Sequence, residues 1–257
     1  MATFLFDKIV FGPVKSRRLG VSLGINLLPT DAKVCNYDCI YCECGWNEKS
    51  NKKKAILPSR EEVSKSLKLR LITMSSEGIL PDVITFAGNG EPTMHPDFEE
   101  IINDTVLLRN TYCPKARIAV LSNATLIYKP AVARALGNVD QNILKLDTVF
   151  EKTFAQINQA AKGISIESLI QNLISFEKKV IIQTLFLKGG NGSIDNTTEV
   201  ELTGLINAYK QIQPEKIMIY TFERDTAASD LKKISAPELK SIAERLEKEG
   251  FMVEVSA

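Results

Sequence analysis

The segment VCNYDCIYCECG, residues 34–45, holds four of the five cysteines of this 257-residue chain. Cys35, Cys39 and Cys42 have the spacing C-x3-C-x2-C, and Cys44 follows two residues later. The first residues of the chain lack the basic start and the apolar run of a secretion signal, so we expect a cytoplasmic protein. Because thiols stay reduced in the cytoplasm, the segment predicts a thiolate site rather than disulfides.

Three kinds of thiolate site fit this spacing to different degrees. Structural zinc sites need four ligands, usually from two separated pairs, whereas this chain has no second pair and one histidine, His95. A thioredoxin-type pair of Cys39 and Cys42 would leave Cys35 without a role. Three close thiolates could hold an iron–sulfur cluster, normally tied by four, and leave its fourth iron open. The spacing favours the cluster, with zinc and a redox pair as alternatives.

Apolar and amphipathic segments alternate on both sides of the cysteines. Short apolar runs are typical of strands buried on both faces of a parallel sheet. The expected strands are 21–28, 82–88, 116–123, 141–147, 179–187, 216–223 and a short one at 251–256. The expected helices are 59–76, 96–110, 128–137, 165–179, 197–213 and 235–250.

These segments predict a single α/β domain over residues 1–257. Residues 1–20 would be an N-terminal extension, 21–223 six strand–helix units, and 224–257 a C-terminal helix and strand. Six units fall short of the eight that close a TIM barrel. We therefore expect a partial (β/α)6 TIM-like barrel with a short terminal strand; a doubly wound open sheet is the alternative. In both, chemistry lies at the carboxyl ends of the strands.

Two motifs together resemble the radical S-adenosylmethionine (SAM) superfamily. CNYDCIYC, residues 35–42, is similar to the family's three-cysteine signature, with an aromatic residue, Tyr41, before the third cysteine. FAGNGEPTMHPDF, residues 86–98, resembles the family's Gly-Gly-Glu segment, although Asn89 replaces the first glycine. The resemblance implies the partial barrel fold and a radical SAM enzyme.

Further segments are similar to one branch of that superfamily, the proteins related to demethylwyosine synthase, which modifies a guanosine in tRNA. These segments are residues 11–29, 143–158 and 217–227. This chain has no cysteine before Cys35 to hold the additional cluster known from that enzyme. The departure weakens the expectation of a tRNA substrate.

The resemblance implies two cofactors, a [4Fe-4S] cluster and SAM. The cluster would cleave SAM reductively to a 5′-deoxyadenosyl radical, which abstracts hydrogen from a substrate that the sequence does not identify. An external flavodoxin or ferredoxin is the expected electron donor. The implied cofactor residues are Cys35, Cys39 and Cys42 for iron, Tyr41 for the adenine, Gly90 and Glu91 for the amino group, and Ser122 and Asn123 for the ribose or carboxylate.

Lys145 and Asp147 interrupt an apolar strand on one face. Charged side chains are expensive there unless they are paired or functional, so a structural ion pair and a catalytic role are both open. Demethylwyosine synthase uses pyruvate, and a Schiff base would be a chemically sensible catalytic role for Lys145.

Several residues outside the two motifs carry weaker signals of function. The net charge of +1 gives little support to a tRNA-modifying enzyme, for which Lys52, Lys53 and Lys54 are the candidate contacts. A glycyl-radical-enzyme activase and an iron–sulfur electron carrier are further possibilities. Arg17 and Arg18 could clamp an anion or form a surface pair, and His95 could cap a helix or act in catalysis. No apolar run approaches the roughly 18 residues of a membrane span, so no membrane partner is expected.

Overall fold

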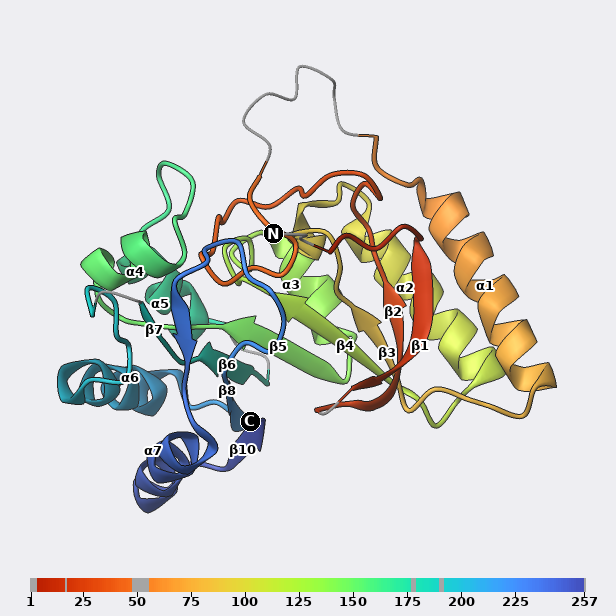
Figure 1. Cartoon of the computed structure of the whole chain (residues 1–257). Helices are drawn as coiled ribbons and strands as arrows, with labels where there is room; N and C mark the ends of the chain where they lie inside the picture. The colour runs from red at the N-terminus through yellow and green to blue at the C-terminus, as the bar shows by residue number, and fades with distance from the viewer. Residues whose placement is uncertain (1–3, 17, 48–55, 177–178, 190–191, 257) are drawn as a thin grey trace.

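The computed structural model describes residues 4–16, 18–47, 56–176, 179–189 and 192–256, and its main feature is a curled sheet of eight strands (Figure 1). The strands lie in the sheet in the same order as in the sequence. β1 is antiparallel to β2, and the remaining neighbours are parallel. The strands are β1 (Val10–Ser16), β2 (Gly20–Ile25), β3 (Val83–Phe86), β4 (Arg117–Ser122), β5 (Gln141–Lys145), β6 (Ile181–Leu185), β8 (Lys216–Tyr220) and β10 (Val253–Ser256).

Helices connect the parallel strands. They are α1 (Arg60–Ser76), α2 (Phe98–Tyr112), α3 (Pro130–Gly137), α4 (Glu151–Ile157), α5 (Ile166–Ile174), α6 (Glu199–Ile212) and α7 (Ala236–Lys248). Right-handed crossovers between strands in sequential order put every helix on the same face. A doubly wound sheet instead needs a point where the strand order reverses. The partial barrel is therefore confirmed. No helix of the described residues is long and apolar enough to cross a membrane.

The structure contains elements that the sequence pattern did not predict. β1 lies within residues 1–20, which we expected only to precede the barrel. A second, antiparallel pair consists of β7 (Leu187–Gly189) and β9 (Leu231–Lys233), and a short 3-10 helix, η1, spans Pro92–Met94. Several expected strands also end early: β2 ends at Ile25, and the next residues, 26–28, are buried but lie outside the strand.

Apolar side chains fill the barrel only partway. One buried layer inside it consists of Leu19, in the turn before β2, and of five residues from successive strands: Val83, Ala119, Ile143, Ile181 and Met218. Side chains alternate between the two faces of a strand, so the next inward positions toward the carboxyl ends come two residues later. On three neighbouring strands these positions are polar: Lys145, Gln183 and Tyr220. The barrel therefore changes from an apolar floor to a polar mouth.

Candidate active site

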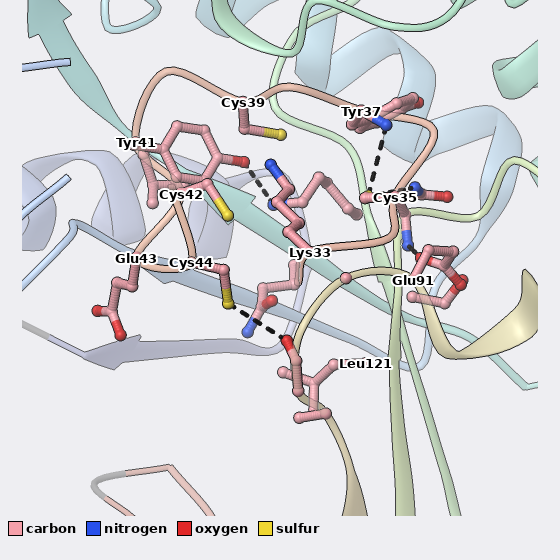
Figure 2. A pocket seen from close by; sticks show the side chains of 18 of the residues that line it. Lys33, Cys35, Tyr37, Cys39, Tyr41, Cys42, Glu43, Cys44, Glu91 and Leu121 are labelled. Atoms are coloured by element: carbon pink, nitrogen blue, oxygen red, sulfur yellow. Dashed lines mark hydrogen bonds between the residues drawn. The ribbon is translucent and has the colours of Figure 1, made fainter. Parts of the chain in front are cut away.

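A cavity of about 280 Å³ opens at the carboxyl ends of the strands (Figure 2). It is lined by the cysteine loop and by residues of β4, β5, β6 and β8. The lining includes nine of the ten predicted site residues: Cys35, Cys39, Tyr41, Cys42, Gly90, Glu91, Ser122, Asn123 and Lys145. The tenth, Asp147, contacts Tyr41 and Lys145. Predicted site residues from four separate segments of the sequence thus meet at one cavity.

Gly90 joins the cysteine loop to the end of β3. It pairs with Val34 in an isolated parallel bridge, where the Val34 N–H donates to the Asn89 carbonyl at 2.8 Å and the Glu91 N–H donates to the Val34 carbonyl at 3.0 Å. The backbone φ of Gly90 is +140°, and a Cβ there would lie 1.8 Å from the Val34 oxygen. Glycine is therefore required for this close backbone approach, whatever ligand the segment binds.

The cysteine loop is also held by the end of α4. The N–H groups of Asp38 and Ile40 donate to the carbonyls of Asn158 and Ile157, at 3.0 and 2.9 Å. These carbonyls have no partner within the helix because they lie in its last turn. The unpredicted helix α4 thus supports the segment that carries the thiols.

Nitrogen donors surround the sulfur atoms. The Tyr37 N–H lies 3.4 Å from Cys35 Sγ, and the Asn158 amide lies 3.5 Å from Cys39 Sγ. Burial raises the pKa of both thiols, that of Cys39 to about 11. Burial alone would lower the pKa of Lys33, but the nearby cysteines and Asp38 raise it overall. Lys33 was not among the residues predicted from the sequence; its ammonium donates to Asp38 and to the Gly45 carbonyl.

Cys44, for which the sequence suggested no role, is the neighbour of Cys42. A hydrogen bond from the Cys44 thiol, together with the charge of Lys33, lowers the pKa of Cys42, although burial opposes this effect. The Cys44 thiol also lies 3.4 Å from the Gly88 carbonyl, which is the alternative acceptor for its single proton. Cys44 therefore favours the thiolate form of Cys42.

The donor set fits an iron–sulfur cluster. Thiolates are the ligands that such clusters use, and N–H groups directed at the sulfurs stabilise their charge. Figure 2 shows Cys35, Cys39 and Cys42 along one loop beside the cavity. Within the described ranges, no three His, Cys, Asp or Glu side chains converge enough to hold a single metal ion.

Glu91 connects the ends of β3 and β4. Its carboxylate accepts hydrogen bonds from the side chain and N–H of Thr93, from the Ser122 hydroxyl at 2.7 Å and from the Asn123 N–H at 2.7 Å. Burial raises the pKa of Glu91, and these bonds oppose that shift. The Asn123 amide in turn donates to Asn36 at 2.6 Å. Contacts of Glu91, Ser122 and Asn123 with SAM stay predictions.

Lys145, Tyr41 and Asp147 form one polar cluster. The Lys145 ammonium donates to the Tyr41 hydroxyl and lies 3.6 Å from the Asp147 carboxylate, which accepts from Tyr41 as well. Burial is the largest single influence on the Lys145 pKa and would lower it, but Asp147, together with Tyr220, Cys39 and Cys42, raises the pKa overall. The ion pair considered from the sequence is thus present. A Schiff base requires a neutral amine, which this arrangement disfavours.

Asn89 and His95 both form hydrogen bonds that hold the backbone near the site. Asn89 is fully buried, and its side chain pairs with the backbone of Phe6 in both directions, at 2.8 and 2.9 Å, and donates to the Pro29 carbonyl. It thus attaches the N-terminal segment to the site. The His95 ring bonds to the Pro58 carbonyl and accepts a hydrogen bond from the Asp97 N–H, just before α2. His95 is thus in a structural position. Arg17 and the lysines at 52–54 lie outside the described residues.

Comparisons with known proteins agree with this architecture. The model of the radical SAM superfamily matches residues 31–199. A UPF0026 protein of Methanocaldococcus jannaschii is 33% identical over 83% of this chain and 63% of its own length. A Brachyspira hyodysenteriae protein named GTPase Obg is 32% identical over 92% of this chain and 33% of its own length. The chain thus spans less than two thirds of either relative.

Solved structures share the fold at low sequence identity. A radical SAM methyltransferase from Sphaerobacter thermophilus has a TM-score of 0.68 at 12% identity, over 91% of this chain and 65% of that one. Streptococcus suis SuiB bound to SAM has a TM-score of 0.63 at 15% identity, over 91% and 50%. Archaeal TYW1 has a TM-score of 0.56 at 16% identity, over 89% and 72%. With its three-cysteine loop at the mouth of a partial barrel and a family match over most of its length, this chain belongs to the radical SAM superfamily.

Proposed function

We propose that the chain is an enzyme that holds a [4Fe-4S] cluster through Cys35, Cys39 and Cys42 and binds SAM beside it in the cavity. When bound, these cofactors would supply a 5′-deoxyadenosyl radical that abstracts hydrogen from a substrate. The observation that carries the proposal is the arrangement of the three cysteines at one cavity together with Gly90 and Asn123. The substrate and product are not part of this proposal.

The residues of the chain would have distinct tasks in this chemistry. The three thiolates would hold iron, while Tyr37 and Asn158 would donate to the sulfurs and so tune the reduction potential. Gly90 would keep the cysteine loop against the strand ends through its contact with Val34.

Around these groups, the buried barrel wall would exclude water, which matters because a carbon radical reacts with most groups that it meets.

The proposal is tested by anaerobic reconstitution with iron and sulfide, followed by reduction with dithionite in the presence of SAM. We expect wild type to bind about four irons per chain and to release 5′-deoxyadenosine, detected by mass spectrometry. Cys35→Ala, Cys39→Ala and Cys42→Ala should each lose both properties. Cys113→Ala is the matched control, because Cys113 lies at the end of α2 and does not line the cavity. Loss of iron in the control alone, or retention of iron and product in all three variants, would contradict the assignment.

We further propose that a separate flavodoxin or ferredoxin supplies the electron. Reduced flavodoxin should then replace dithionite in the same assay and yield 5′-deoxyadenosine. If neither reduced flavodoxin nor reduced ferredoxin yields 5′-deoxyadenosine, while dithionite does, this part of the proposal is contradicted.

A further inference from the structure

Three neighbouring strands place polar side chains next to one another on the barrel interior. Lys145 on β5 and Gln183 on β6 are register partners, and Leu185 on β6 is the partner of Tyr220 on β8. Partners on adjacent strands are about 4.8 Å apart and point to the same face. All four of these side chains line the cavity.

Arg18 reaches this group from the turn between β1 and β2. Its guanidinium carbon lies 4.6 Å from the centre of the Tyr220 ring, a cation–π distance. Arg18 also lines the cavity, together with Gln183. Arg18 thus comes from the amino-terminal side of the barrel and reaches the polar residues of the cavity through the barrel interior.

Two nitrogen donors in this group are unsatisfied. Arg18 Nη1 and Gln183 Nε2 are both buried and have no hydrogen-bond partner among the described residues. Gln183 is only 5% exposed. A buried donor without a partner costs free energy, and the cost is larger for a charged group. Two such donors at one cavity indicate a site for a ligand that accepts hydrogen bonds.

The charges around the cavity indicate what kind of acceptor fits. Lys145 is paired with Asp147, and Lys33 with Asp38. Among the lining carboxylates, Glu43 is bonded to Arg224 at 3.1 Å, and Glu91 accepts from three residues of the site.

None of the ion pairs found among the described residues includes Arg18. A single guanidinium without a carboxylate partner matches a monoanion better than a dianionic phosphate, and guanidinium and amide N–H groups are well suited to a carboxylate.

We propose that Arg18 and Gln183 bind a carboxylate group of the substrate through Arg18 Nη1 and Gln183 Nε2. This inference rests on the proposed function, because it concerns the substrate of the same cavity. It assigns a role to Gln183, which the sequence did not single out, and selects the anion-binding alternative for Arg18. The Tyr220 ring would act as a positioning surface for the guanidinium.

The test is a binding measurement on the reconstituted protein with propionate as the probe and propionamide as its neutral analogue, by calorimetry or saturation-transfer NMR. Wild type should bind propionate at least tenfold more tightly than propionamide or inorganic phosphate. Arg18→Met should weaken propionate binding by about 10- to 100-fold, as expected for a charge-assisted hydrogen bond. Gln183→Glu, which puts a carboxylate at the ligand position, should abolish it. Arg134→Met, an exposed arginine paired with Glu99, is the control and should bind as wild type does.

A second readout separates ligand binding from a structural role. Because Arg18 Nη1 is unpartnered without ligand, Arg18→Met should leave the urea midpoint of the ligand-free protein unchanged or raise it, whereas a structural arginine predicts a lower midpoint. If this variant does not fold, Arg18→Lys keeps the charge and should lose about tenfold in affinity.

Several results would overturn the inference. These are equal binding of propionate and propionamide, propionate binding that does not depend on Arg18, or a tenfold loss of SAM binding in Arg18→Met with propionate unaffected. Failure of the proposed function is a different result: wild type would take up no cluster or release no 5′-deoxyadenosine.

Discussion

Replacing Gly90 with alanine should separate the cysteine loop from the barrel. The added Cβ would lie 1.8 Å from the oxygen and 2.4 Å from the carbonyl carbon of Val34. Both are backbone atoms, so the two segments must move apart. The φ of +140° at Gly90 is also a conformation that alanine rarely adopts, at a cost of about 1–3 kcal/mol.

The expected loss of stability follows from the hydrogen bonds that this movement breaks. Two hydrogen bonds join the segments, from Val34 to Asn89 and from Glu91 to Val34, and each contributes about 1 kcal/mol. With the backbone strain, Gly90→Ala should lower the free energy of unfolding by about 3–5 kcal/mol. This loss is a large part of the stability of a typical domain.

The assay is urea unfolding of the reduced, cluster-free protein, followed by measurement of iron content after reconstitution. Gly78→Ala is the matched control, since Gly78 also has a positive φ, +71°, but a Cβ there meets no atom within 4 Å. The control should lose only about 1–2 kcal/mol and bind iron normally. If Gly90→Ala unfolds at the same urea concentration as Gly78→Ala and retains its iron, the role of this contact is refuted.

Three further predictions concern the groups around the thiols. Asp147→Asn leaves the Lys145 ammonium without its counter-charge and should cost about 3–5 kcal/mol in urea unfolding, part of which Lys145→Met in the same chain restores. Cys44→Ala should raise the pKa of Cys42 and, because alkylation requires the thiolate, slow iodoacetamide labelling of Cys42 at pH 7 in the cluster-free protein. Asn158→Ala removes a donor to the Cys39 sulfur and should make the reduction potential more negative by roughly 40 mV, for a bond of about 1 kcal/mol.

Each of these predictions has a control and an outcome that contradicts it. The exposed Asp230→Asn should not change stability, and an Asp147→Asn protein within 1 kcal/mol of wild type would show that the ion pair contributes little. Peptide mapping locates the alkylated cysteine, and an unchanged pH profile at Cys42 would exclude the effect of Cys44. Asn207→Ala, at an exposed position of α6, should leave the potential unchanged; an equal shift there would show that the effect is not local.

Most strands and helices could be predicted from the sequence, because hydrophobic periodicity indicates the barrel. The clustering of the site residues could also be predicted, because the carboxyl ends of the strands meet at one end of a barrel. Gly90 shows the limit of this reasoning. Its segment was interpreted as ligand-binding, whereas its conformation is already required by the contact with Val34. Glu91 is similar, because its bonds to Ser122 and Asn123 depend on the distance between two strand ends, which periodicity does not give.

Other features left a weaker signal or none. The helix α4 spans only seven residues, too few for a clear helical period, so its support of the cysteine loop could not be anticipated. Gln183 is a polar residue in an apolar strand, which is the same signal that singled out Lys145, and the same reasoning could have found it. The contact of Arg18 with Tyr220 joins the two ends of the barrel and follows only from the folded structure.

The central claim is that three thiolates hold a cluster with one iron open to SAM, and electron paramagnetic resonance of the reduced, reconstituted protein tests it most directly. We expect the signal of a reduced [4Fe-4S] cluster whose g-values shift when SAM is added, and whose shift is retained in Cys44→Ala. A reduced protein without a cluster signal, or with one that SAM leaves unchanged, would contradict the account.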